Sequence, residues 1–395
     1  MTRRALISGG SIGGLFAACA LMRAGWRVDV YERTGVELAG RGAGIVTHDP
    51  LIAALEAVGA STKDLGVKVS ERVAYDITGD RVRTMEYPQI VTSWDRMHQV
   101  LRAVIPDDNY HLGRAIVGYE EHAGGVSAIF EDGSREHADL LVGADGFRSA
   151  IRAQMLPDVT PQYAGYVVWR ALASEADFPA DVHRQVFDTF GFFIPNGTQI
   201  IGYPIAGPNN DLRPGHLRYN FVWYARVAPD DLDDMLTDAS GLRHEISIPP
   251  PLVRNDVLQR MEADANARLP TPFVEILKLS ERPFFTPIYD HHSPVMGQGH
   301  VALAGDAACV ARPHVGMGVT KAALDALALA RHLEQGSIPE ALTAYSDERV
   351  AASRVAYERS QRLGVYIFGG PEAENMDGRS HPDMETVMRD TAVVI

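Results

Sequence analysis

The 395-residue sequence predicts an α/β fold with two lobes, and three observations lead to that prediction. A short apolar strand at Arg4–Ser8 runs into a glycine-rich turn at residues 9–14 and then into a helical pattern. Residues 163–227 form alternating, aromatic-rich segments, which are typical of an antiparallel sheet. An apolar strand at residues 301–304 again ends in an acidic turn, a glycine loop and a helix. The chain therefore leaves its first lobe and returns to it late.

Bulk composition narrows the range of functions. With 46% hydrophobic and 22% charged residues, the chain resembles an ordinary globular protein. A net charge of −14 without a dense run of Lys or Arg argues against nucleic acid as a partner. Cys19 and Cys309 give neither a disulfide framework nor a metal-binding pattern, so we expect no metal and a cytoplasmic location. The basic start of the chain could pass for a signal peptide, but glycines interrupt the run that follows; no export signal or membrane contact is expected.

A strand–turn–helix–strand pattern over residues 4–31 predicts the opening unit of a Rossmann-like dinucleotide-binding domain. Gly9 suits the tight turn, and Gly14 suits close packing of the helix on the strand. Glu32 ends the second strand, where an acidic residue can bind a ribose hydroxyl. Ser11 replaces the middle glycine of the motif, so the backbone can approach a pyrophosphate less freely there.

The loop from Arg41 to Gly44 is rich in glycine, which suits either a flexible loop or a backbone that passes close to a flat cofactor. A helix is predicted over residues 50–58. His48 precedes it and is a candidate substrate contact, although such a histidine more often lies at the surface. Strands are predicted within residues 73–87, and a hairpin around residues 132–133. The buried strand at residues 140–142 ends in Asp145-Gly146, which we group with the first and last turns because ligands of open sheets lie beyond strand ends.

The second lobe is predicted to contain strands at residues 163–172, 185–188, 198–205 and 217–227, a surface helix at 228–238 and a proline loop at 249–251. Closing helices follow over residues 338–363, and the last 25 or so residues form a tail or a surface wrap. We predict a discontinuous first domain at residues 1–72, 94–160 and 285–345. The second domain takes residues 73–93 and 161–284, and residues 346–395 form a C-terminal helix and tail.

The three turns carry a resemblance to a known family, the single-component FAD-dependent aromatic hydroxylases of the p-hydroxybenzoate hydroxylase-like group. Within the group, the chain is similar to hydroxylases of dihydroxypyridines. The motifs are Ala144-Asp145-Gly146 with Ser149 and Arg152, and Gly305-Asp306-Ala307-Ala308 with Pro313, Gly316 and Gly318. Further shared segments are Gly9-Gly10-Ser11-Ile12, residues 163–170, Tyr203-Pro204-Ile205, residues 220–224 and Arg312-Pro313-His314.

The resemblance implies FAD as cofactor, NADH or NADPH as reductant, and O₂ and a small aromatic or heteroaromatic ring as substrates, by way of a flavin C4a-hydroperoxide. It implies that Glu32 binds the adenosine ribose, Asp306 a ribityl hydroxyl, and the helix start after Gly316 the flavin's N1/C2=O edge. Many relatives have an arginine at the position of Trp94, so another residue must supply its phosphate contact, with Arg96 and Arg41 as candidates. The predicted FAD site comprises Gly9, Ser11, Ile12, Gly13, Gly14, Glu32, Arg33, Arg41, Gly44, Asp145, Gly146, Gly305, Asp306, Gly316, Met317 and Gly318.

Pro313 and His314 are the predicted catalytic pair, with Pro313 over the reaction site and His314 as a base or hydrogen-bond partner for the ring. The alternative is that His314 only caps its loop. Tyr203, Trp169 and Trp223 are predicted substrate contacts, with core packing as the alternative for each. We expect Arg170 on the opposite strand face from Trp169 and therefore in a structural role.

The predicted activity is hydroxylation of an electron-rich, hydroxypyridine-like ring. Urate-type and salicylate-type monooxygenases and tailoring hydroxylases of secondary metabolism remain alternatives within the family. A flavin-loaded sensor is the non-enzyme alternative. Relatives are often dimers, which leaves a homodimer open.

Overall fold

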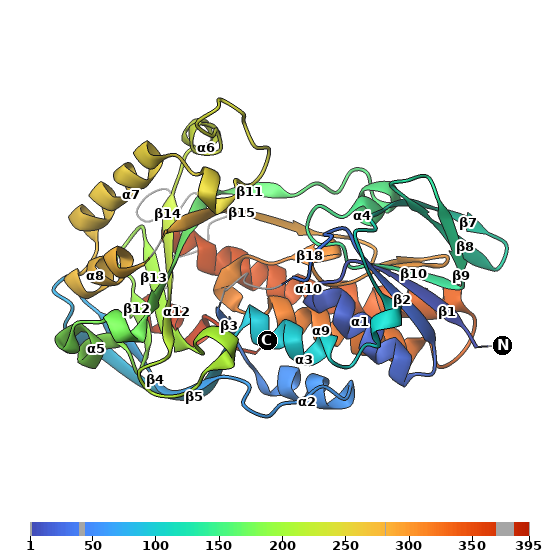
Figure 1. Cartoon of the computed structure of the whole chain (residues 1–395), viewed down its shortest axis with the longest axis horizontal. Coiled ribbons are helices and arrows are strands. Elements are labelled where there is room, and N and C mark those ends of the chain that lie inside the picture. The colour runs from blue at the N-terminus through green and yellow to red at the C-terminus, as the bar shows by residue number, and fades with distance from the viewer. Residues whose placement is uncertain (1, 39–43, 281, 369–382, 395) are drawn as a thin grey trace.

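The computed structural model describes residues 2–38, 44–280, 282–368 and 383–394 (Figure 1). The first lobe is built on a mostly parallel six-stranded sheet, as predicted. Its helices include α1 (Ile12–Arg23), α3 (Trp94–Arg102) and α9 (Gly318–His332), and α1 packs against both of the others. The strand order is β16 (Gly297–Gln298), β17 (Val301–Leu303), β10 (Leu140–Gly143), β1 (Arg4–Ser8), β2 (Arg27–Glu32) and β6 (Tyr110–Leu112).

A small three-stranded sheet adjoins this lobe and contains the predicted hairpin around Asp132-Gly133. Its strands are β7 (Ile116–His122), β8 (Gly125–Phe130) and β9 (Arg135–Ala138).

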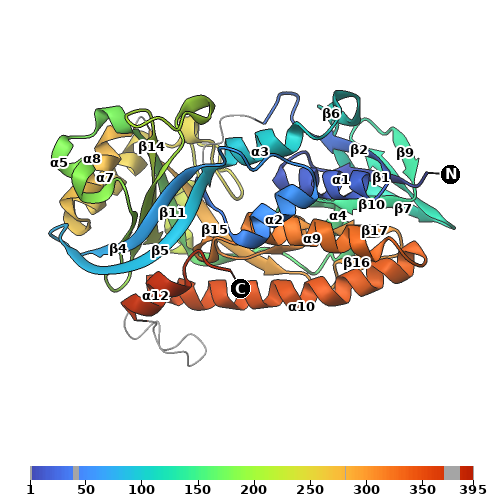
Figure 2. The ribbon, with the colours of Figure 1, turned by 90° about the horizontal axis from the view of Figure 1, so that it is seen from below.

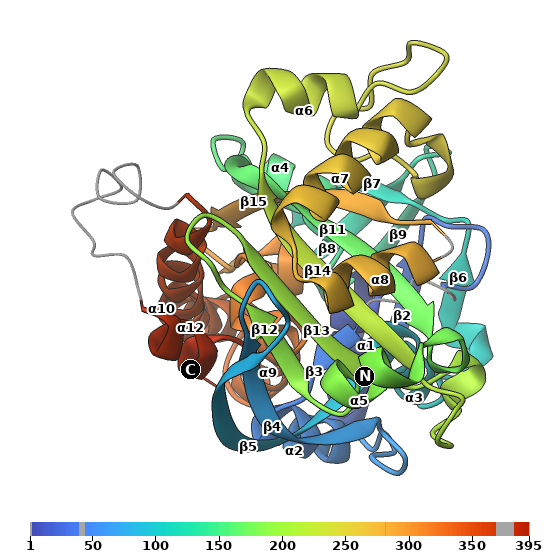
Figure 3. The same ribbon diagram turned by 90° about the vertical axis from the view of Figure 1, so that its left-hand side faces the viewer.

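The second lobe is a nine-stranded, mainly antiparallel sheet. Helices α7 (Asn255–Arg268) and α8 (Thr271–Leu279) lie across one of its faces (Figure 3). Its strands, in order, are β18 (Cys309–Val310), β15 (Phe284–His292), β11 (Gln162–Ser174), β14 (Arg218–Arg226), β13 (Gln199–Ile205), β12 (Phe190–Phe193), β4 (Val67–Tyr75), β5 (Arg81–Ser93) and β3 (Gly44–Val46).

The strand predicted at residues 185–188 is wrong. Those residues form the end of α5 (Ala180–Val186) and the turn after it, and β12 comes later. The apolar residues here have helical spacing: Val182 and Val186 lie four residues apart, and both are buried in the same core.

The nine-stranded sheet also bears on the domain division. It includes β3, the start of β4, β15 and β18, which the predicted bounds place wholly or partly in the first domain. The division remains a proposal, and we move these four strands to the second domain.

The predicted closing helices are one helix, α10 (Ile338–Gly364), which runs along both lobes (Figure 2). A capping box of Ser337 and Glu340 starts it. The described end of the chain contains α12 (Met384–Asp390), whose Val387 and Met388 are buried against the second lobe. Of the two alternatives for this end, residues 383–394 therefore form a wrap rather than a free tail. None of the helices in the described ranges is long and apolar enough to cross a membrane.

Candidate active site

Three turns follow neighbouring strands and lie together at one edge of the parallel sheet. β10 pairs in parallel with β1 on one side and β17 on the other, so Ser8, Gly143 and Leu303 lie on adjacent strands. The turns at residues 9–14, 145–146 and 305–306 start just beyond these positions. The structure thus brings together the motifs that the sequence grouped, at the edge where open α/β sheets bind ligands.

The first turn has no room for a side chain at Gly9 or at Gly14. Gly9 has a φ of 109°, and a Cβ there would lie 2.4 Å from the carbonyl oxygen of Ala144. A Cβ at Gly14 would lie 1.9 Å from the carbonyl oxygen of Gly9. Ser11 is the N-cap of α1 and makes no side-chain capping bond, so N–H groups at the helix start remain for a ligand. Ile12 and Gly13 begin that helix.

Glu32 joins this turn to the end of β2. Its Oε2 accepts the N–H of Gly10 at 2.9 Å, and Oε1 accepts the N–H and O–H of Thr34 at 2.9 and 2.7 Å. These bonds give Glu32 a role in shaping the turn, beside its predicted role at a ribose. Arg33 is exposed to solvent, and Arg41 lies outside the described residues.

Asp145 mainly caps the short helix α4 (Ala150–Met155). Its Oδ2 accepts the N–H of Ala150 at 2.8 Å, while its Oδ1 is buried with no partner in the described chain. Burial raises the pKa of this carboxyl. Gly146 follows and has a φ of 80°. A Cβ placed there would have no atom within 4 Å, so a ligand can approach its backbone.

Asp306 offers a free carboxylate in the last turn. Its side chain lines the cavity described below and has no hydrogen bond to any described residue. Although water can reach it, protein atoms surround it on most sides, and this raises the pKa of its carboxyl. Gly305, just before it, has a φ of 61°. Such a carboxylate is a ready acceptor for a hydroxyl of a bound ligand.

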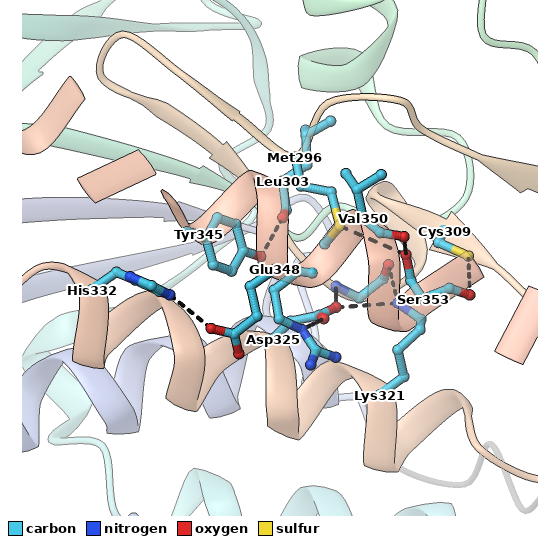
Figure 4. Close-up of polar contacts among 12 residues, drawn as sticks. Met296, Leu303, Cys309, Lys321, Asp325, His332, Tyr345, Glu348, Val350 and Ser353 are labelled. Atoms are coloured by element: carbon cyan, nitrogen blue, oxygen red, sulfur yellow. Dashed lines mark hydrogen bonds and ion pairs between the residues drawn. The ribbon is translucent and has the colours of Figure 1, made fainter. Parts of the chain in front are cut away.

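A buried ionic cluster fixes the Gly305 turn from behind (Figure 4). Asp325 on α9 is fully buried and accepts the N–H of Gly305 at 3.1 Å. Lys321 Nζ donates to the Gly305 carbonyl at 2.8 Å and lies 3.2 Å from Asp325, while Arg349 Nε reaches Asp325 at 2.8 Å. Tyr345 donates to the carbonyl of Leu303 at 2.7 Å. The cluster therefore holds the turn in place while leaving Asp306 free.

These features fit a flavin dinucleotide. The glycine turn exposes helix N–H groups for phosphate, and Asp306 is open to a ribityl hydroxyl. Gly318 begins the 15-residue helix α9, and a Cβ there would have no neighbour within 4 Å, so the space before this helix is open to a ring edge. Gly316 and Met317 border the same space.

A cavity of about 560 Å³ extends from Asp306 and the loop that follows it to the second sheet, a size typical of small-molecule sites. The loop side contributes Pro313 and His314, and Gly44 contributes from β3. A Cβ at Gly44 would lie 2.6 Å from the ring of Tyr203, so only glycine allows this close approach. From the sheet the lining includes Arg170, Phe190, Ile201, Tyr203, Val222, Tyr224 and Ile288.

Trp169 and Trp223 do not lie among the residues that line the cavity. Both point to the other face of the sheet, into the core that α7 and α8 cover. Trp223 is fully buried, and its Nε1 donates to Thr198 at 2.8 Å. Their predicted substrate contact is therefore corrected to the alternative, core packing, whereas Tyr203 does line the cavity. Because side chains alternate along a strand, Arg170 lines the cavity, where Trp169 was predicted to lie.

His314 is completely buried, and both of its ring nitrogens are engaged. Nδ1 lies 3.0 Å from Oε1 of Gln199, and Nε2 lies 2.9 Å from the hydroxyl of Tyr166. An amide oxygen only accepts, so Nδ1 donates and Nε2 accepts from Tyr166. Burial, aided by the charge of Arg312, lowers the pKa of His314 to about 3. This geometry argues against the predicted base: both ring nitrogens are occupied, the lowered pKa makes the ring a weak proton acceptor, and the ring stacks on Tyr224 with centroids 4.2 Å apart.

Two further predictions meet a mixed outcome. His48 is buried beside the cavity rather than at the surface, with Nδ1 2.9 Å from the hydroxyl of Thr320 and Nε2 unpartnered among described residues. Arg96, one of the two replacements considered for an arginine at position 94, is engaged with Gln99 and the carbonyl of Lys63.

Sequence reasoning missed several residues that line the cavity: Arg170, Tyr224, Thr391 and Ala392. Arg170 and Tyr224 had a signal, because they alternate with the two tryptophans on their strands. Thr391 and Ala392 had none, since they lie in the polar end of the chain.

Known proteins similar to this chain agree with the site. A model of the FAD binding domain-like family matches residues 163–290. 2,6-Dihydroxypyridine 3-monooxygenase of Paenarthrobacter nicotinovorans is 35% identical over 331 residues, covering 83% of this chain and 82% of the relative. Aurachin C monooxygenase/isomerase of Stigmatella aurantiaca is 30% identical, with coverage of 91% and 88%.

A solved structure is also similar along the whole chain. The structure of 2,6-dihydroxypyridine-3-hydroxylase from Arthrobacter nicotinovorans superposes with a TM-score of 0.89 at 30% identity, covering 100% of this chain and 97% of that one. Together with the three turns and the cavity, these likenesses show that the chain belongs to the single-component FAD-dependent aromatic hydroxylases and is an NAD(P)H-dependent flavoprotein monooxygenase.

Proposed function

We propose that this monooxygenase hydroxylates an electron-rich, hydroxylated nitrogen heteroaromatic ring, with 2,6-dihydroxypyridine as the first candidate. The name of the 35% identical relative supports this class of substrate. The observation that carries the proposal is the composition of the cavity, where aromatic side chains and one unpaired arginine face the loop of Pro313.

Arg170 is the proposed anchor for the ring. It lies on the cavity face of β11 and has no ion pair or hydrogen bond with any described residue. Its charge favours the ionised forms of Tyr203 and Tyr224, although burial still raises the pKa of both hydroxyls. The same charge would favour the ionised form of a ring hydroxyl. A ring that binds in that form, with its proton already lost to solvent, is richer in electrons, so the proposal needs no histidine base.

The remaining lining residues orient the ring and exclude water. Tyr203 stacks on Phe190 with centroids 4.8 Å apart, and together they form a flat aromatic wall. Ile201 and Val222 extend this apolar wall. His314 acts as a support in this proposal, since it fixes Tyr166 and Gln199 behind the cavity.

FAD, once bound and reduced by NADH or NADPH, supplies the activation of O₂ from which one oxygen atom is transferred. We propose that Asp306 holds its ribityl chain, that Glu32 lies at its adenosine ribose, and that the start of α9 at Gly318 faces the charged edge of the ring. Asp306→Ala is expected to bind FAD at least tenfold more weakly, measured by flavin fluorescence titration of the refolded or stripped protein. Stoichiometric flavin retained by this variant would remove Asp306 from the site.

The substrate proposal is tested with a panel of 2,6-dihydroxypyridine, other hydroxypyridines, urate and salicylate. Oxidation of NADH and of NADPH is followed with each ring, and the product is analysed after reaction under ¹⁸O₂. We expect a hydroxypyridine to stimulate oxidation and to gain one ¹⁸O atom. Stimulation by urate or salicylate alone would replace the proposed substrate, and flavin that responds to no ring would favour a sensor.

Two further proposals concern the setting of the enzyme. Cys19 and Cys309 are both free thiols, which supports a cytoplasmic location. A homodimer remains a prediction, and light scattering of the purified protein measures it directly.

A further inference from the structure

The end of the chain forms part of the cavity wall. Thr391 and Ala392 follow α12, are 1% and 4% exposed, and both line the cavity. The N–H of Ala392 donates to the carbonyl of His314 at 3.0 Å. A Cβ at Gly316 would lie 2.9 Å from the Cα of Ala392. The turn at residues 391–392 therefore packs directly on the loop that borders the cofactor space.

Arg72 on β4 binds this turn from behind. It is completely buried, and its Nη1 donates to the carbonyls of Met388 and Thr391 at 2.5 and 2.6 Å. Its Nη2 donates to the carbonyl of Ala392 at 3.1 Å and to Oε1 of Gln89 at 2.8 Å. One guanidinium thus donates hydrogen bonds to three backbone carbonyls near the end of the chain.

The charge of Arg72 has no carboxylate partner among the residues that the structure describes. Its other neighbours are the rings of Tyr87 and Phe190, with centroids 3.9 and 5.3 Å from the guanidinium carbon. Burial lowers the pKa of Arg72 to about 10. A buried charge is costly unless it is fully hydrogen-bonded, so the carbonyls of the turn stabilise the charge of Arg72. The same hydrogen bonds hold the turn in place. Phe190 also stacks on Tyr203, so the same arginine supports the aromatic wall.

Thr391 brings an unsatisfied polar group to this wall. Its hydroxyl is buried and has no hydrogen-bond partner in the described chain. Buried hydroxyls nearly always have a partner, so this one is suited to a ligand.

We propose that Arg72 is a positioning residue that holds residues 391–392 as a wall of the substrate cavity, and that the hydroxyl of Thr391 hydrogen-bonds a polar group of the ring. The second half rests on the proposed function. The first half does not, because it concerns only how the end of the chain is held.

The test compares Arg72→Gln with Arg83→Gln in the FAD-loaded enzyme. Arg83 is a matched control, since it pairs with Glu385 of the same helix α12 but does so at the surface, with both side chains about half exposed. Carboxypeptidase digestion, followed by mass spectrometry, reports how firmly the end of the chain is held. The KM and kcat for 2,6-dihydroxypyridine are measured in parallel, with flavin content as the check on folding.

For Arg72→Gln we expect at least tenfold faster release of the last residues and at least a tenfold rise in KM, with bound flavin retained. Arg83→Gln should match the wild type in both. Digestion and KM of Arg72→Gln that equal those of the control would overturn the positioning role. If wild-type enzyme responds to no ring, the proposed function fails, but the digestion comparison still decides the role of Arg72.

Thr391→Val tests the hydroxyl separately and keeps the shape of the side chain. We expect a three- to tenfold rise in KM with wild-type digestion, because the wall stays in place. An unchanged KM would remove Thr391 from the substrate contacts. If Arg72→Gln does not fold, this variant still tests the second half of the proposal, and Arg72→Lys, which keeps the charge but not the fork of donors, takes its place in the digestion comparison.

Discussion

The two faces of the nine-stranded sheet are buried to a similar degree but differ in chemistry. On the helix-covered face, Trp169 and Trp223 sit in a continuous apolar core under α7 and α8. On the cavity face, Arg170 and Tyr224 follow the two tryptophans on the same strands, and Tyr203 joins them from β13; all three line the open space. The difference teaches that burial alone does not separate core from site. An unpaired charge does, because Arg170 on the cavity face has no ion pair or hydrogen bond with any described residue, whereas a core does not hold an unpaired charge.

The largest expected effect belongs to the core face. Trp223→Ala removes a fully buried indole and should cost about 3–5 kcal/mol of unfolding free energy. Denaturant unfolding measures this loss, and Leu252→Ala, at a residue 43% exposed, should stay within about 0.5 kcal/mol of the wild type. The KM of the folded Trp223→Ala fraction should not change. A variant of normal stability with an altered KM would contradict the assignment of this face.

The opposite pattern is expected at Arg170. Arg170→Met should weaken ring binding by about 1.5–3 kcal/mol, the usual value for a hydrogen bond to a charged group, which raises KM roughly 10- to 100-fold. The unfolding free energy should be nearly unchanged, since no described residue is hydrogen-bonded or ion-paired to Arg170. Arg213→Met, at an exposed surface pair with Asp211, is the control. Lost stability with an unchanged KM would make Arg170 structural, as its sequence position first indicated.

The protonation of His314 should affect the pH dependence of the unfolding free energy rather than the pH profile of catalysis. Its folded pKa of about 3 lies below the ordinary value of 6.5, so the unfolded chain binds the extra proton between these values. Stability from this residue is therefore complete above pH 6.5 and falls on acidification by up to about 1.4 kcal/mol per pH unit.

Urea unfolding between pH 4.5 and 7.5 compares the wild type with His314→Asn. The variant should show the shallower slope, while His216→Asn, at an exposed histidine, should keep that of the wild type. Equal slopes for His314→Asn and wild type would mean that His314 is not held neutral. An activity profile that loses an inflection near neutrality in this variant would restore it as a base.

The smallest effect is expected from one hydroxyl on the cavity face. Tyr203→Phe keeps the ring stacked on Phe190 and removes only a polar atom. A net hydrogen bond is worth about 0.5–1.5 kcal/mol, so KM should rise roughly two- to tenfold with stability unchanged. Steady-state kinetics with 2,6-dihydroxypyridine measures it; no change would limit Tyr203 to packing.

The sequence could group the three turns at the cofactor end of this site because their signals are local. Gly9, Asp145 and Asp306 each follow a buried strand, and parallel pairing brings such ends together. The cavity end depends on distant packing. Alternation separates Arg170 from Trp169, but only the position of α7 and α8, about 90 residues later in the chain, decides which of the two faces is covered by helices.

Two other features had no local signal either. His314 is hydrogen-bonded by Tyr166 and Gln199, which come from strands 148 and 115 residues away. The end of the chain looks like a tail until Arg72, more than 300 residues earlier, supplies its hydrogen bonds. Such contacts arise from tertiary structure, which periodicity and turn motifs do not encode.

The most direct measurement is a crystal structure of the FAD-loaded enzyme with 2,6-dihydroxypyridine. We predict that the ring lies on the cavity face between Pro313 and Tyr203, with a guanidinium nitrogen of Arg170 about 2.7–2.9 Å from a ring oxygen. A ring bound elsewhere, or an Arg170 guanidinium that makes no contact with it, would contradict the proposed site.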